Sequence, residues 1–128
     1  MNEKKLVVQN LWRKETDMEI KVEDFEDKKI VTPIGEIDMS TSVELRSTLL
    51  KILRQKPSTL IISLEKITYI DSSGLATLIE CMQEMEKFKG KLKLIIAEKR
   101  ILDVFKLARL DRVFDISEEK TGNNHPSI

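Results

Sequence analysis

The junction at residues 71–78 constrains this chain most, because an extended segment ends there and a helix begins. The preceding run 60–70 is rich in apolar residues, and from Leu75 onwards apolar residues recur at intervals of three or four. Such intervals are typical of an amphipathic helix. Ser72 and Ser73 stand at the expected helix start, where serine is a common N-cap. The junction therefore predicts a β-strand that leads directly into a helix.

The rest of the chain alternates between strand-like and helix-like patterns. We expect a β-hairpin over 18–34, with a polar turn at 26–29 and an irregular or edge position at Pro33. The other expected strands are 59–70, interrupted at Glu65-Lys66, then 92–97 and a short 113–116. Helices are expected over 42–55 with an apolar face that includes Val43, over 73–88 with Gly90 as the C′ residue, and over 99–109.

Strands that alternate with helices predict parallel pairing through right-handed crossovers. We therefore expect an α/β fold: one domain with a mixed four- to five-stranded sheet and helices mainly on one face. The run 59–64 is apolar at successive positions, so this strand should be covered on both faces.

Composition excludes several classes of protein. The 22 basic and 22 acidic residues cancel, and the longest basic cluster is Lys99-Arg100, so direct nucleic-acid binding is not expected. No apolar run approaches the roughly 20 residues of a membrane span. The N-terminus lacks the apolar stretch of a signal peptide. The single cysteine, Cys81, falls inside the second helix and reads as a packed small residue. These features predict a cytoplasmic protein without an internal disulfide.

Ser72 allows two interpretations. It could simply cap the helix, or its hydroxyl could be functional, since a helix start favours an anion and serine can be converted into one by a kinase. Asp38 and Asp71 each follow a strand and precede a helix, and such junctions meet at one edge of a parallel sheet. They could contact a ligand there or only cap the helices. Gly74 could serve only to allow close packing of helix on sheet.

Catalytic and cofactor motifs are missing from the sequence. His125 is the only histidine and lies in the polar tail, so a Ser-His-Asp triad is not expected. There is no zinc-binding cluster, P-loop or dinucleotide fingerprint. The alternative is that Ser72 acts as a nucleophile with Lys66 or Lys99 as its base. We expect no catalytic residue, no metal and no cofactor.

Three segments together resemble the STAS domain: Gly35-Glu36-Ile37-Asp38 before a helix, 67–75 with its Asp-Ser-Ser-Gly-Leu element, and 91–97. Within that family the chain is similar to the bacterial anti-sigma factor antagonists. The resemblance covers about 18–117, which leaves 1–17 as an N-terminal extension and 118–128 as a tail whose polar composition predicts disorder. The apolar residues of the extension, Trp12 among them, could pack on the domain as a strand or helix, form an exposed contact arm, or support a homodimer.

The resemblance implies a regulatory binding protein that is not an enzyme. Such an antagonist binds an anti-sigma factor that is also a serine kinase, and so releases a sigma factor. The kinase then phosphorylates the first serine of the element, and a serine phosphatase restores it. The matching acceptor here is Ser72. The residues that the resemblance implies around it on the partner-binding surface are Asp71, Ser73, Gly74, Asp38, Glu36 and Thr41.

The alternative within the same fold is a STAS subunit of a membrane lipid transporter or of a stress-sensing complex. Such a subunit would contact a permease and an ATPase, or the other members of a large assembly. An acceptor serine behind an acidic residue favours the kinase-coupled function.

Overall fold

A computed structural model of the chain describes residues 5–8 and 18–118. The elements in chain order are β1 (Lys5–Val8), β2 (Glu19–Phe25), β3 (Lys28–Ile37), α1 (Ser42–Leu53), β4 (Thr59–Ser63), β5 (Ile67–Ile70), α2 (Ser72–Lys87), β6 (Lys91–Ile95), α3 (Lys99–Leu107) and β7 (Asp115–Ser117). The α/β alternation predicted from the sequence is confirmed, as are the three helices.

The strands form one mixed sheet in the order β1-β2-β3-β4-β6-β7, with β5 added beside the end of β3. Pairing is antiparallel among β1, β2 and β3, and parallel elsewhere. The sheet therefore has more strands than the four to five expected. Two additions are β1, from the N-terminal extension, and the separation of 59–70 into two strands.

The separation of β4 from β5 follows from how β3 is shared. Lys28–Val31 of β3 pair with β4, whereas Gly35–Ile37 pair with β5. The chain turns between them, where the Ile67 N–H donates to the Leu64 carbonyl at 3.1 Å. Proline has no backbone N–H to donate to a neighbouring strand. Pro33 lies between the two paired segments, so the missing donor falls where β3 changes its partner from β4 to β5. The irregular position predicted for Pro33 is confirmed.

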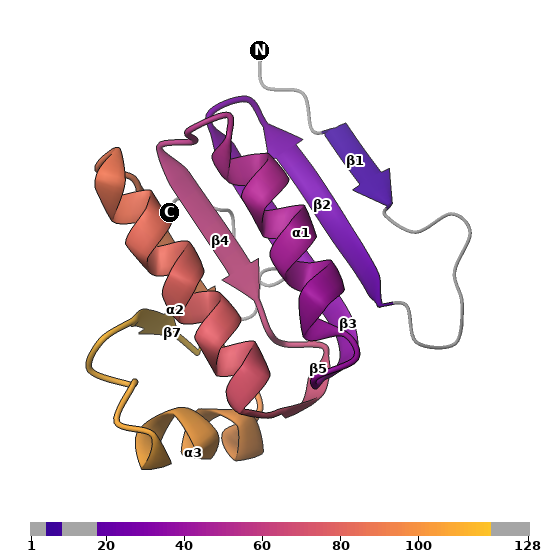
Figure 1. Cartoon of the computed structure of the whole chain (residues 1–128), viewed down its shortest axis with the longest axis vertical. Coiled ribbons are helices and arrows are strands. Elements are labelled where there is room, and N and C mark those ends of the chain that lie inside the picture. Colours follow the sequence, from indigo (N-terminus) through magenta and orange to yellow (C-terminus); the bar gives the residue numbers. More distant parts are fainter. Residues whose placement is uncertain (1–4, 9–17, 119–128) are drawn as a thin grey trace.

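Helices α1 and α2 lie side by side over one face of the sheet, and α3 lies across the end of the molecule at which α2 begins (Figure 1). Helices mainly on one face, as predicted, leave the largest core between α1, α2 and the sheet. Representative members of this core are Leu45 and Leu49 of α1, Leu78 and Met85 of α2, and Ile20, Leu60, Ile62 and Leu94 of the sheet. The guanidinium of Arg46 also bonds the carboxylate of Glu80 at 2.7 and 2.8 Å, which ties α1 to α2.

Strand β4 is buried on both faces, as its unbroken apolar run predicts. Leu60 and Ile62 point toward the helices, whereas Ile61 packs with Ile30 and Ile95 in a second cluster. Successive strand residues alternate between faces, so a strand that lies in the middle of the sheet needs apolar residues at both sets of positions.

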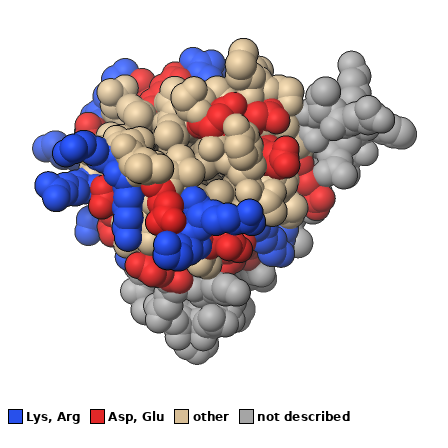
Figure 2. Space-filling view, turned by 90° about the horizontal axis from the view of Figure 1, so that it is seen from below, with Lys and Arg blue, Asp and Glu red and all other residues tan. Residues whose placement is uncertain are grey.

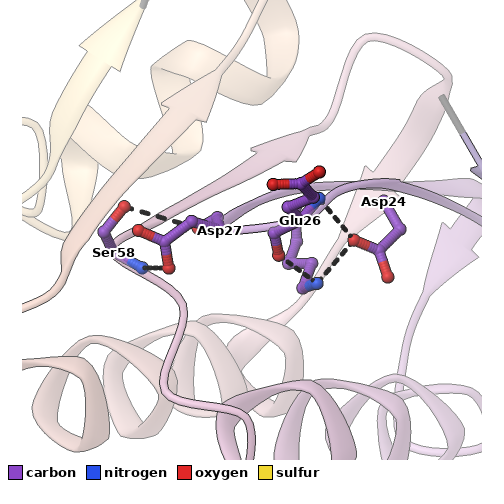
Figure 3. A network of polar contacts seen from close by, with 5 residues as sticks. Asp24, Glu26, Asp27 and Ser58 are labelled. Carbon is purple, nitrogen blue, oxygen red and sulfur yellow. Dashed lines mark hydrogen bonds and ion pairs between the residues drawn. The ribbon is translucent and has the colours of Figure 1, made fainter. Parts of the chain in front are cut away.

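A polar network holds the β2–β3 turn at the end of the sheet away from the start of α2 (Figure 3). The buried ammonium of Lys29 donates to the Asp24 carboxylate and to the Glu26 carbonyl. Asp27 accepts from the Ser58 N–H at 3.1 Å, which joins this turn to the start of β4. The buried cation is thus paired, as a charge removed from water requires.

The N-terminal extension contributes β1, whose Lys5–Val8 pair with Lys21–Asp24 of β2. Of the alternatives for these residues, the strand is confirmed. Trp12 and the tail at 119–128 lie outside the described residues. Within the described ranges, no helix combines the length and apolar character that crossing a membrane requires.

Candidate functional site

The ends of β3 and β5 bring two acidic residues together. Ile37 pairs with Ile70, and the Asp71 N–H donates to the Ile37 carbonyl at 3.1 Å. Asp38 and Asp71 therefore leave neighbouring parallel strands at the same edge of the sheet. The prediction that the two junctions meet is confirmed.

The N-cap of α2 is Asp71. One oxygen of its carboxylate, Oδ1, accepts from the Ser73 N–H at 2.9 Å and from the Gly74 N–H at 3.3 Å. The Ser73 hydroxyl donates to the same oxygen at 2.6 Å. A carboxylate satisfies several helix-start donors at once and complements the helix dipole. The interpretation of Ser72 as a mere helix cap is therefore wrong.

Ser72 is the first residue of α2, and its side chain is exposed. Its hydroxyl makes no hydrogen bond with any residue that the structure describes. The neighbouring Ser73 is only partly exposed, and its hydroxyl is held by Asp71. The two serines thus differ sharply in how easily another protein could reach and modify them.

Asp38 organises the turn that leads into α1. Its carboxylate accepts from the Ser40 hydroxyl at 2.7 Å, from the Ser40 N–H at 2.9 Å and from the Thr41 N–H at 3.2 Å. These bonds, the Ser40 hydroxyl first, lower the pKa of Asp38 below its usual value. Asp38 is therefore a carboxylate at neutral pH. Its carbonyl also accepts from the Ser42 N–H at 2.8 Å. Among the caps predicted over 38–42, the residue at the N-cap of α1 is Thr41, whose side chain makes no capping bond.

Thr41 fixes the loop that carries Asp38. Its hydroxyl donates to the Glu36 carbonyl at 2.7 Å and accepts from the Asp38 N–H at 2.9 Å. The Glu36 side chain remains exposed. Thr41 thus shapes the loop, whereas Glu36 presents a charge to solvent.

Gly74 lets the start of α2 approach the sheet. A Cβ at this position would lie 2.6 Å from Ile37 Cγ2 and 2.7 Å from Ile70 Cγ1, well inside van der Waals contact. The packing function predicted for Gly74 is confirmed. By contrast, the left-handed residue after α2 is Lys89 (φ 61°), so the prediction that Gly90 takes this C′ conformation is wrong.

Three exposed apolar residues lie on the segments that meet at this edge of the sheet, and sequence reasoning missed them as a group. Met39, Val43 and Tyr69 are 78%, 70% and 49% exposed, and they are three of the five large apolar residues exposed in the described part of the chain. We call them the apolar rim. Val43, expected on the buried face of α1, faces solvent because only Leu45, Leu49 and their neighbours point to the sheet. The signal available was a methionine in the otherwise polar turn 38–42.

Cys81 is buried on the inner side of α2, and burial raises the pKa of its thiol to about 12. A thiol so protonated is a poor nucleophile. No cluster of three metal-ligating side chains occurs in 18–118 or among the other described positions. The arrangement at the sheet edge therefore offers an accessible serine, two neighbouring carboxylates and an apolar contact area.

Known proteins show which family this chain resembles. Residues 19–125 match the STAS domain family. This chain belongs to that family. The STAS protein is 32% identical over 88 residues to the anti-sigma-B factor antagonist of Bacillus subtilis (strain 168), and the match covers 69% of this chain and 80% of the relative.

Solved structures show the same fold. An anti-sigma factor antagonist from Mycobacterium paratuberculosis aligns with a TM-score of 0.75 and 24% identity, over 83% of this chain and 90% of its own. The anti-sigma factor antagonist SpoIIAA in its unphosphorylated form aligns with a TM-score of 0.64 and 19% identity, over 80% and 91%. Its phosphorylated form, from Bacillus, aligns with a TM-score of 0.62 and 22% identity, over 78% and 92%. The resemblance to anti-sigma factor antagonists that the sequence suggested is confirmed.

Proposed function

We propose that this STAS protein is an anti-sigma factor antagonist whose binding is switched by phosphorylation of Ser72. In its unmodified form it binds an anti-sigma factor with serine kinase activity and so releases a sigma factor. The kinase phosphorylates Ser72 and ends the binding, and a serine phosphatase reverses the change. The observation that carries the proposal is the free, exposed hydroxyl of Ser72 beside the fully engaged hydroxyl of Ser73.

The choice of Ser72 over Ser73 has a geometric reason. A kinase must reach the hydroxyl oxygen and remove its proton as the new bond to phosphorus forms. At Ser73 that proton already lies in a 2.6 Å bond to the Asp71 carboxylate. Phosphorylation there would break the bond and set a dianion against the cap. At Ser72 no such bond has to break.

The apolar rim supplies a contact area for the partner. Figure 2 looks at the end of the molecule where α2 begins and shows a broad area with few charged side chains. Large exposed apolar side chains gathered in one place mark protein interfaces. Met39 and Val43, on the turn before α1 and on its first turn, would enter an apolar surface of the anti-sigma factor.

A phosphate on Ser72 would act mainly by local electrostatics. It adds a charge of about −1.5 to −2 at neutral pH, beside Asp71 and near Asp38. The helix start offers partial positive charge, so the fold need not open. A partner surface that fits a neutral hydroxyl would then meet repulsion and a desolvation cost. About 3 kcal/mol of such coupling lowers affinity more than a hundredfold.

The test starts with a pull-down from the native host, and the recovered anti-sigma factor is then purified. Its dissociation constant is measured by calorimetry against wild type, Ser72→Ala, Ser72→Asp and Ser73→Ala. We expect Ser72→Asp alone to bind much more weakly, and mass spectrometry to find kinase-dependent phosphate on Ser72 only. Recovery of a permease and an ATPase, with binding indifferent to Ser72, would instead move the protein to the transporter class.

A further inference from the structure

The outward face of α3 and the turn after it form a basic surface at the end of the molecule where α2 begins (Figure 1). The inner face of α3 is fixed in the core by Ile101 and Phe105, which are 2% and 0% exposed. The opposite face is therefore held toward solvent in a defined orientation. We call it the basic α3 surface; its residues are Lys99, Arg100, Lys106, Leu107, Arg109 and Arg112, all exposed.

The cations of this surface are mostly unpaired. Lys99 lies 3.2 Å from Asp103 on its own helix. The other four, Arg100, Lys106, Arg109 and Arg112, make no ion pair with any residue in the described part of the chain. Residues 98–112 carry five cations and three carboxylates, in a chain whose total charge is zero. In Figure 2, Lys and Arg side chains lie along the left and lower edges of this end, interspersed with Asp and Glu side chains, and the left edge is the side on which α3 lies in Figure 1.

An apolar side chain stands among these charges. Leu107 is 86% exposed, the highest value among the large apolar residues exposed in the described ranges. An exposed leucine among cations is complementary to a protein surface that has an apolar pocket and an acidic border. The basic α3 surface and the apolar rim lie on different sides of the start of α2, since the rim is carried mainly by α1 and the turn before it (Figure 1).

We propose that the basic α3 surface docks the serine phosphatase that removes phosphate from Ser72. This inference rests on the proposed function. A phosphatase has to bind the phosphorylated form, so it cannot depend on the contact that phosphorylation abolishes. A surface at the same end of the molecule, but outside the apolar rim, meets that requirement.

The chemistry of the partner follows from its reaction. A water oxygen bonds to phosphorus, the bond between phosphorus and Ser72 Oγ breaks, Oγ takes up a proton, and inorganic phosphate leaves. Phosphatases that activate this water with divalent cations hold the metal ions with carboxylates, and the partner inferred here carries further carboxylates, free of metal, around its active-site mouth. Such a mouth is complementary to Arg100, Lys106, Arg109 and Arg112. Charge complementarity of this kind chiefly raises the rate of productive encounter and weakens with salt.

The experiment uses the full chain with phosphoserine incorporated at position 72 during synthesis, so that no kinase is needed. The enzyme is the purified metal-dependent serine phosphatase of the host, assayed with Mn²⁺. The first variant, called the α3 variant, changes four cations of the basic α3 surface to glutamine: Arg100, Lys106, Arg109 and Arg112. The matched control changes four exposed cations at the far ends of α1 and the sheet: Lys51, Arg54, Lys56 and Lys91. Each variant removes four charges, and each contains one position with positive φ, Arg109 or Lys56.

We expect kcat/KM to fall roughly tenfold or more in the α3 variant, mainly through KM, and to stay near the wild-type value in the control. Adding Leu107→Ser to the α3 variant should lower kcat/KM further. The difference in kcat/KM between the α3 variant and the wild type should shrink at high salt. A phosphoserine peptide spanning 66–80, which lacks α3, should be cleaved with a lower kcat/KM than the wild-type phosphoprotein. Circular dichroism and Tm verify that both variants are folded.

Equal kcat/KM for wild type and both variants would overturn the docking surface while leaving phosphorylation of Ser72 intact. Loss of anti-sigma factor binding in the α3 variant would also overturn it, because the surface would then belong to the kinase. Binding of the wild type to phosphatidylglycerol vesicles, with dephosphorylation unchanged in the variant, would assign the surface to a membrane. Failure of the phosphatase to act even on the wild-type phosphoprotein would overturn both this inference and the reversible switch.

Discussion

Replacing Asp71 with asparagine and with alanine separates the capping function of this side chain from its charge. In the structure one carboxylate oxygen accepts from two backbone N–H groups and from the Ser73 hydroxyl. Asparagine keeps an oxygen at that place and is about as good an N-cap as aspartate. Alanine removes the acceptor altogether. The two variants should therefore differ in stability, although both lose the negative charge.

The magnitude follows from the bonds that are lost. Removal of an N-cap costs about 1 to 2 kcal/mol. For a chain of this size that corresponds to a decrease in Tm of roughly 3 to 8 °C. We expect Asp71→Ala to show this decrease and Asp71→Asn only a small part of it. Asp71→Ala should also free the Ser73 hydroxyl, so that phosphate appears on Ser73 as well as on Ser72.

Two assays check this reasoning. Thermal unfolding followed by circular dichroism gives the two Tm values, and mass spectrometry after incubation with the purified kinase gives the phosphorylated positions. Ser73→Ala is the control, because it removes the hydroxyl and leaves the carboxylate bonded to the backbone. Equal destabilisation by asparagine and alanine would refute the capping argument. Phosphate confined to Ser72 in Asp71→Ala would refute the idea that the bond to Asp71 protects Ser73.

Three further predictions concern Gly74, Cys81 and Asp38. Gly74→Ala should lower stability by about 1 kcal/mol, because overpacking against Ile37 and Ile70 outweighs the higher helix propensity of alanine; a higher Tm would contradict the close contact. Cys81 should resist a thiol reagent at pH 8 until denaturant is added, because burial raises its pKa to about 12, and fast labelling of the folded protein would contradict its burial. The pKa of Asp38 is lower in the folded protein than in the unfolded chain, so its carboxylate stabilises the fold above about pH 4, and this contribution disappears as the pH falls further. Asp38→Asn should flatten that part of the curve of stability against pH. An unchanged slope would contradict the lowered pKa.

Features that depend on a few consecutive residues could be read from the sequence. The strand that ends at Ile70, the helix that follows and the buried face of that helix all arise from local periodicity. The packing function of Gly74 was also predictable, because it stands where a helix begins against a strand. The resemblance to the STAS family rested on the same short segments.

Some local details were nevertheless read incorrectly. Ser72 was a candidate cap, yet the carboxylate before it takes that function because it can accept from two N–H groups and a hydroxyl. Val43 was assigned to the buried face, yet it is exposed, because α1 turns Leu45, Leu49 and Ile52 toward the sheet instead. In both cases several residues of suitable chemistry were adjacent, and the sequence alone could not choose between them.

The sequence by itself determined the order of strands and helices, the class of the fold and the serine at the start of α2, because these depend on contacts within a few residues. Only the tertiary structure decided that β5 pairs with the end of β3, which brings Asp38 beside Asp71. It also decided which apolar and basic side chains remain exposed at the end of the molecule where α2 begins. Non-local pairing and exposure depend on how the whole sheet buries its two faces, and no short segment contains that information.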